Sequence, residues 1–205
     1  GRGHEARLVP GFGRSDRYLA DGDAERAAAL VTAFADPSIA AVLALRGGYG
    51  SARILDRLDW PRMAATPKPL LGFSDITALN LALLRRTGMV SFTGLNCVPD
   101  LKDGVLPALN ERTLWLALRG EELRFGGLEV QRPGHASGPL IGGCLSILTS
   151  LLGTDYLPDL TGAILFIEDV NEEPYRVDRM VNQLRLAGVF RRVAGVALGS
   201  FVHCE

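Results

Sequence analysis

The sequence is poor in the features that mark several large classes of protein. Its 205 residues include only three cysteines, which lie far apart without CxxC spacing. This scarcity argues against a disulfide framework and against structural zinc, and it favours a reducing compartment, so we expect a cytoplasmic protein. The 22 basic and 23 acidic residues leave a net charge of −1, which provides no electrostatic surface for nucleic acid or an anionic membrane. No apolar run approaches the roughly 20 residues that span a bilayer.

Apolar residues make up 47% of the chain and fall into short runs that alternate with helical patterns. Buried strands are expected within 38–45, 69–73, 89–94, 163–170 and 193–201, and the short apolar stretch PLIGG stands at 139–143. Helices are expected within 21–37, 51–58, 75–88, 110–122, 144–153 and 174–188, and a turn-rich β segment at 123–138. This alternation predicts an α/β fold, with a flavodoxin- or Rossmann-like parallel sheet and helices on both of its faces.

Two domains are expected. An amino-terminal α/β domain covers 1–110, and 111–205 holds a linker and part of a smaller carboxy-terminal α/β domain, with the boundary somewhere in 100–137. The chain begins without Met and stops just after a predicted strand, so we expect it to be one part of a longer protein.

Ser74 lies between the predicted strand at 69–73 and a predicted helix. A strand, a tight turn at Gly72, a serine and a helix form the arrangement of a nucleophile elbow, in which the N–H of the next residue, Asp75, can face an oxyanion. The match is partial, because Ile76 stands where that pattern has glycine. The alternative is that Ser74 or Asp75 caps the helix.

The stretch RGGYG, Arg46 to Gly50, follows another predicted strand. Its three glycines expose backbone N–H groups at the carboxyl edge of the sheet, where ligands bind. The loop could supply a second oxyanion donor or hold a phosphate, and the alternative is a plain turn. It is not a Walker loop, because no Gly-Lys-Ser/Thr follows.

Acidic residues end the predicted strand at 163–170. Their burial is costly unless they serve a partner. Glu168 could orient a catalytic histidine. Two alternatives remain: a divalent cation held by an acidic cluster, or salt bridges to nearby arginines; the residues concerned are Glu168, Asp169, Glu172, Glu173, Arg176 and Arg179.

The histidines, His4, His135 and His203, all lie in contexts typical of surface residues. A serine hydroxyl needs an adjacent base to become a nucleophile. The residues alone therefore leave the candidate serine without a base.

Six stretches in order carry a resemblance to a known family. They read LRGGYG, GFSDITAL, GGCLSILTSLLGT, LFIEDVNEEPYRVDR, QLRLAG and VAGVALGSF, and the match runs from about Tyr18 to Glu205. The chain resembles the L,D-carboxypeptidases, also called muramoyl-tetrapeptide carboxypeptidases, whose relatives include the microcin C self-immunity peptidases.

The resemblance implies a serine peptidase with a Ser-Glu-His triad, no metal and no cofactor, usually in a homodimer. The implied substrate is a muropeptide, a cell-wall tetrapeptide in murein recycling, from which a terminal D-alanine is removed from an L-centre. The family's serine falls on Ser74, its glutamate falls on Glu168, and its oxyanion hole falls on Gly47, Gly48 and Asp75.

Two departures bear on the substrate. The chain has Cys144 where the family usually has Asn, and it reads FTGLN at 92–96 where the family tends to read His-Gly-Pro. The family's histidine follows the glutamate by several tens of residues. We therefore expect the base beyond Glu205, and we expect His203, which comes too early, to lie out of reach of Ser74.

Two other functions stay open. A microcin-immunity-type peptidase would cleave a peptidyl-nucleotide adduct. A protein of another class would be a doubly wound binding module whose glycine-rich loop holds a phosphate ligand, with Ser74 only a helix cap.

Overall fold

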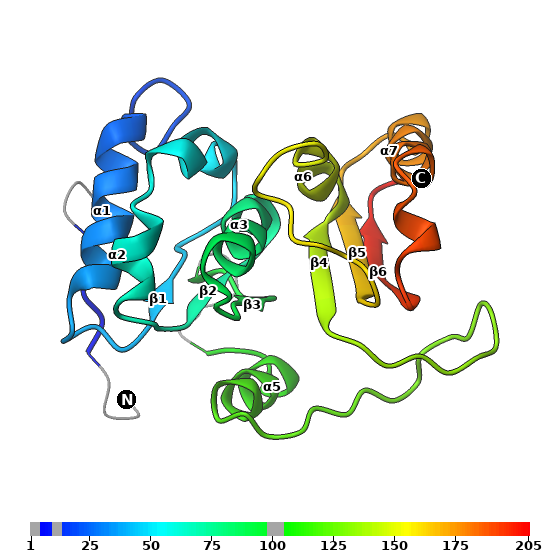
Figure 1. Ribbon diagram of the computed structural model, residues 1–205. Helices are drawn as coiled ribbons and strands as arrows, with labels where there is room; N and C mark the ends of the chain where they lie inside the picture. The colour runs from blue at the N-terminus through cyan, green and yellow to red at the C-terminus, as the bar shows by residue number, and fades with distance from the viewer. Residues whose placement is uncertain (1–4, 10–13, 98–104) are drawn as a thin grey trace.

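The computed structural model describes residues 5–9, 14–97 and 105–205. It contains two parallel three-stranded sheets with flanking helices (Figure 1). The predicted α/β class and the parallel pairing are thus confirmed. The first sheet lies within 1–110 and the second within 111–205, and the exact domain boundary stays a prediction.

The first sheet has the order β1-β2-β3. Its strands are short: β1 (Val42–Leu43), β2 (Leu70–Gly72) and β3 (Phe92–Thr93). The elements around it are α1 (Asp23–Ala35), η1 (Ser51–Arg57), α2 (Trp60–Ala64), η2 (Ser74–Ile76) and α3 (Thr77–Thr87). The regular part of each strand is much shorter than the apolar run that predicted it, because the sheet pairs only two or three residues of each run.

The second sheet has the order β4-β5-β6, formed by β4 (Leu140–Cys144), β5 (Ile164–Val170) and β6 (Gly195–Val202). Its helical elements are α6 (Leu145–Ser150), α7 (Pro174–Leu186) and η3 (Val189–Arg191). Alternate residues of β6, among them Val196 and Leu198, are exposed. Packed elements therefore cover only one side of this edge strand within the described residues.

The segment between the two sheets differs from the prediction. Helix α5 (Ala108–Leu118) forms as expected, but 123–138 contains no strand. Phe125, Leu128 and Val130 are all exposed. A strand needs a neighbour for its backbone groups and a surface for its apolar face, and this segment has no strand partner in the described part of the chain.

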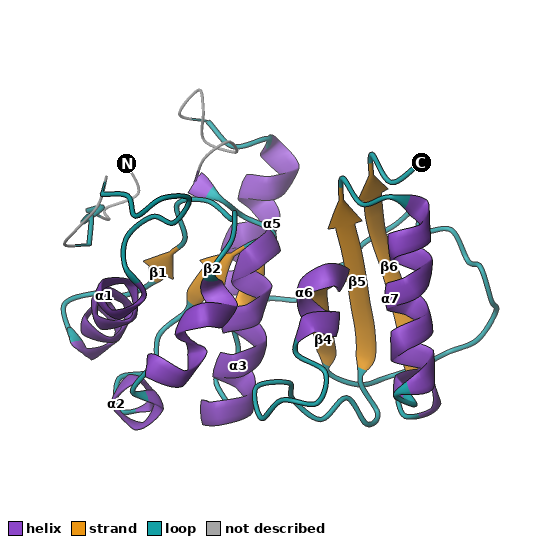
Figure 2. Ribbon diagram, turned by 90° about the horizontal axis from the view of Figure 1, so that it is seen from above, coloured by secondary structure: helices purple, strands orange, loops and turns teal. Residues whose placement is uncertain are grey.

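Helix α3 lies between the two sheets (Figures 1 and 2). It contacts β2 and β3 on one side and β4 and α6 on the other. One apolar cluster runs through β2, α3, β4, α6 and β5, and it includes Leu81 and Ala82 of α3, Leu145 and Leu148 of α6, and Leu165 of β5. Burial of these side chains fixes the first sheet against the second. None of the helices in the described ranges is long and apolar enough to cross a bilayer.

Candidate active site

Ser74 sits at a strained turn between β2 and α3. Phe73 is extended, whereas Ser74 has φ +61°, a left-handed conformation that costs a non-glycine residue about 1 kcal/mol or more. Gly72 makes the turn possible, because a Cβ at that position would lie 2.5 Å from the Ile76 side chain. The predicted strand–turn–serine–helix geometry is therefore present, and Ile76 occupies the space beneath Gly72.

The helix-cap alternative is wrong. The N-cap residues of η2 and α3 are Phe73 and Ile76, and neither helix start has a side-chain cap hydrogen bond. The Asp75 carboxylate bonds elsewhere, to Ser51. A capping hydrogen bond therefore does not account for the strained backbone at Ser74.

The glycine-rich loop packs directly on the serine. A Cβ on Gly47 would lie 2.9 Å from Ser74 Cβ and 3.2 Å from Ser74 Oγ. Gly48, at φ +123°, has open space around the corresponding position. The first N–H groups of a helix lack acceptors within the helix. Gly47 therefore lies against Ser74, and Asp75 follows Ser74 within η2. The role of Gly47, Gly48 and Asp75 as oxyanion donors stays a prediction.

Glu168 lies on the neighbouring sheet, in β5. It is only 5% exposed, and its Oε1 atom has no hydrogen-bond partner in the described part of the structure. Burial, and then the charge of Asp169, raise the pKa of Glu168 to about 7. A buried carboxyl with an unused oxygen is a group that can still receive a hydrogen-bond donor.

Two of the other acidic residues, Asp169 and Glu172, have structural partners. Asp169 accepts hydrogen bonds from the backbone N–H of Ser146 at 2.8 Å and of Val170 at 2.8 Å, so it caps α6. Glu172 pairs with Arg176 at 3.7 Å, and the Arg179 guanidinium lies over the Tyr175 ring. The salt-bridge alternative thus holds for Glu172, and it is wrong for Glu168 and Asp169, which form no ion pair within the described ranges. Across those ranges, no group of three or more His, Cys, Asp or Glu side chains could hold a metal ion.

One hydrogen bond joins the serine's helix to the glutamate's sheet. The backbone N–H of Cys144 donates to Thr77 Oγ1 at 3.1 Å, and both residues are buried. Cys144 is in turn the register partner of Glu168. Gly143 is required beside this bond, because a Cβ there would lie 2.6 Å from Thr77 Oγ1. We did not predict this connection; the only signals in the sequence are the paired glycines before Cys144 and the threonine that starts α3.

Of the two departures from the family pattern, Cys144 lies at this junction, and Thr93 of the 92–96 stretch is the register partner of Gly72. Burial raises the pKa of the Cys144 thiol to about 11, and its sulfur lies 3.2 Å from Ser146 Oγ, so it is a neutral, hydrogen-bonded side chain. In the 92–96 stretch, Phe92 and Thr93 form β3 and Asn96 is buried.

The histidines do not complete a triad in the described structure. His135 is exposed between α5 and β4, and His203 is exposed just after β6. Neither forms a hydrogen bond with Ser74 or Glu168 among the described residues, and Ser74 and Glu168 do not bond each other directly. His4 lies outside the described residues. The position of the base stays a prediction.

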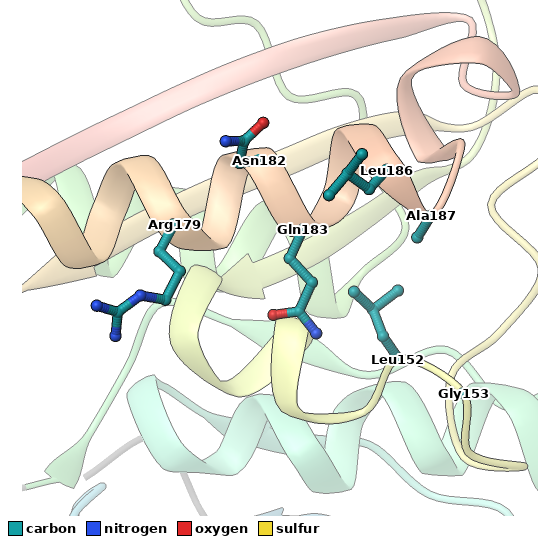
Figure 3. A pocket seen from close by; sticks show the side chains of 7 residues that line it. All are labelled: Leu152, Gly153, Arg179, Asn182, Gln183, Leu186 and Ala187. Carbon is teal, nitrogen blue, oxygen red and sulfur yellow. The ribbon is translucent and has the colours of Figure 1, made fainter.

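An open depression lies elsewhere, along α7 and the turn after α6 (Figure 3). Arg179, Asn182 and Gln183 line it from α7, and Leu152 and Gly153 from the turn. None of the candidate site residues lines it, so it is separate from the chemistry considered above.

Comparisons with known proteins match both halves of the chain. Residues 1–94 match the LD-carboxypeptidase N-terminal domain, and 137–205 match the LD-carboxypeptidase C-terminal domain. A murein tetrapeptide carboxypeptidase of Pseudomonas aeruginosa is 39% identical over 204 residues, which cover 92% of this chain and 64% of the relative. The chain spans 62–66% of the length of the first curated relatives that it matches.

Comparison with solved structures finds the same family. The crystal structure of muramoyltetrapeptide carboxypeptidase from Oxalobacter formigenes superposes with a TM-score of 0.90 at 35% identity, covering 100% of this chain and 69% of that one. The microcin C7 self-immunity protein MccF, known from Escherichia coli, superposes with a TM-score of 0.82 at 26% identity, covering 96% and 68% of the two chains. The resemblance read from the sequence is therefore confirmed, and the chain belongs to the LD-carboxypeptidase family.

Proposed function

We propose that this chain carries the nucleophile and the acid of a serine-type L,D-carboxypeptidase, which releases terminal D-alanine from an L-centre in cell-wall tetrapeptides. The observation that carries the proposal is Ser74, held at φ +61° with Gly47 against its hydroxyl. Strain of this kind persists only where the surrounding structure over-determines it, and it concentrates at functional sites. The names of the murein and muramoyl carboxypeptidases support the choice of substrate.

In the proposed reaction, Ser74 Oγ attacks the carbonyl carbon of the L-centre while a histidine base takes its proton. The carbonyl oxygen becomes an oxyanion, which accepts hydrogen bonds from the backbone N–H groups of Gly47, Gly48 and Asp75. The histidine returns the proton to the nitrogen of D-alanine, and the C–N bond breaks. Water then hydrolyses the acyl-enzyme by the same steps.

In this scheme Glu168 orients the histidine. Its carboxylate accepts the imidazole N–H and stabilises the imidazolium that forms. The unpartnered Oε1 supports this role, because the histidine N–H would satisfy it. We place the histidine beyond Glu205, and we propose a cytoplasmic homodimer that needs no cofactor.

A second candidate is cleavage of a peptidyl-nucleotide adduct. The likeness to MccF favours it, since that protein has been solved in complex with aspartyl sulfamoyl adenosine. The nucleophile and acid would be the same residues. The binding-module alternative has less support, because it makes Ser74 only a helix cap and neither helix start has a side-chain cap hydrogen bond.

The test uses the complete protein that contains this chain. Purified murein tetrapeptide and an aminoacyl sulfamoyl adenosine are supplied in parallel, and released D-alanine and free nucleoside are measured by mass spectrometry. Release of D-alanine by the wild type and not by Ser74→Ala supports the carboxypeptidase. Turnover of the nucleotide adduct alone would transfer the proposal to the second candidate, and turnover of neither would overturn both.

A further inference from the structure

The Asp75 side chain bonds to the exit of the glycine-rich loop. Asp75 Oδ2 accepts two hydrogen bonds from Ser51, at 2.9 Å from the backbone N–H and at 2.7 Å from the hydroxyl. Both residues are buried, at 5% and 4% exposure. Hydrogen bonds to a charged acceptor are about twice as strong as neutral ones, and burial keeps water from competing for them.

The same loop is held from its other side by α1. Arg26 Nη2 donates to the carbonyl of Gly50 at 3.1 Å, and Asp23 holds Arg26 at 2.7 Å. Gly50 fits there only as glycine, since it has φ +115° and a Cβ would lie 2.9 Å from Leu19. The exit of the loop is therefore fixed at two consecutive residues, Gly50 and Ser51, whereas Gly48 faces open space.

We propose that Asp75 is a positioning residue, whose side chain sets the distance between the glycine loop and the backbone at the nucleophile. This inference rests on the proposed function, in which the N–H groups of Gly47, Gly48 and Asp75 bind the oxyanion. Two of these donors lie on the loop and one lies on Asp75 itself. A single residue thus carries one donor on its backbone and fixes the other two through its side chain.

Fixed donors matter most in the transition state, where the oxyanion exists. Loss of one donor costs roughly 100-fold to 1,000-fold in kcat, and a donor displaced by about 1 Å costs up to about 100-fold. Substitutions that loosen the loop should therefore lower kcat and leave KM nearly unchanged. Loss of a bond that only stabilised the fold would lower the melting temperature without lowering kcat at constant KM.

The chain contains a matched control. Asp36 Oδ1 also accepts both the N–H and the hydroxyl of one serine, Ser38, at 2.8 and 2.7 Å, but this pair is exposed and local. The variants are Asp75→Asn, Asp75→Ala and Ser51→Ala, with Asp36→Ala and Ser38→Ala as controls. All are made in the complete protein.

The wild type is first tested for release of D-alanine and for reaction of Ser74 with a fluorophosphonate. Labelling without release of D-alanine rejects the proposed function and leaves the labelling rates to test Asp75, whereas no labelling at Ser74 overturns both proposals. Across the folded variants, we expect kcat and the labelling rate to fall about 10-fold to 100-fold for Asp75→Ala, less for Asp75→Asn and Ser51→Ala, and to stay within about 2-fold for the controls. If Asp75→Ala does not fold, the kcat and labelling rate of Ser51→Ala are used to test the proposal. The double variant Ser51→Ala/Asp75→Ala should match Asp75→Ala alone. Equal kcat in wild type, Ser51→Ala and Asp75→Asn would overturn the proposal, as would losses matched by the controls.

Discussion

Thr77 Oγ1 accepts a buried hydrogen bond of 3.1 Å from the backbone N–H of Cys144. Thr77 begins the helix that follows the candidate nucleophile, and Cys144 pairs in register with the candidate acid, Glu168. This bond therefore links the two halves of the proposed site across the two sheets.

Replacement of Thr77 with valine tests how much this bond contributes. Valine keeps the shape of threonine but leaves the Cys144 N–H buried without an acceptor, so the free energy of unfolding should fall by about 1–3 kcal/mol. The measurement is urea denaturation. The control is Thr113→Val, where an exposed hydroxyl bonds only within its own helix; its effect should be within about 0.5 kcal/mol. Equal effects of the two substitutions would contradict the role given to Thr77.

A second prediction uses the strain at Ser74. At φ +61° glycine is favoured over alanine, so Ser74→Gly should be more stable than Ser74→Ala by about 1 kcal/mol, whereas both should be inactive. Thermal unfolding and D-alanine release would be compared for the two variants. A more stable alanine variant would show that the serine does not hold the left-handed conformation.

Gly47 gives a third prediction. A Cβ at this position would lie 2.9 Å from Ser74 Cβ, so Gly47→Ala must displace the loop or the serine. A displacement of about 1 Å costs up to about 100-fold in rate, and we expect a loss of this order in fluorophosphonate labelling of Ser74. Gly126→Ala is the control, because a Cβ there meets open space. Labelling of Gly47→Ala at the wild-type rate would show that the glycine-rich loop is not part of the active site.

The sequence predicted those parts of the site that depend on local order along the chain. The apolar runs within 69–73 and 163–170 indicated buried strands, which placed Ser74 just after one strand and Glu168 near the end of the other. In the structure Glu168 lies two residues before the end of β5. The same reasoning failed for 123–138, where apolar residues such as Phe125 are exposed, because strand formation depends on a partner elsewhere in the chain.

Long-range partners could not be predicted from the sequence. The carboxylates of Asp75 and Asp169 are each next to a candidate site residue, yet they bind Ser51 and Ser146, 24 and 23 residues away. Only the folded structure distinguishes these two structural acids from Glu168, whose oxygen has no partner among the described residues.

A fourth prediction concerns pH. The pKa of Glu168 is about 7 in the folded chain, against an ordinary value of 4.5, so the folded state binds this proton more tightly than the unfolded state. The stability from this group is fully present below pH 4.5 and is lost as the pH rises through 7. In Glu168→Gln that loss is absent, so the stability of the variant relative to wild type should rise by about 2–3 kcal/mol between pH 5 and pH 8.

Denaturant unfolding of this chain at several pH values measures the difference. Glu172→Gln, at the surface pair with Arg176, is the control and should follow the wild-type profile. A flat difference between wild type and Glu168→Gln across pH 5 to 8 would mean that Glu168 is not the buried, unpartnered acid described above.

The central claim is that Ser74 is a nucleophile, and the most direct measurement is the site of covalent labelling. The complete protein is treated with a fluorophosphonate, digested and analysed by tandem mass spectrometry. The account predicts one phosphonylated residue, Ser74, with labelling lost in Ser74→Ala and slowed in Glu168→Gln. Modification at another serine, or unchanged labelling in Ser74→Ala, would contradict it.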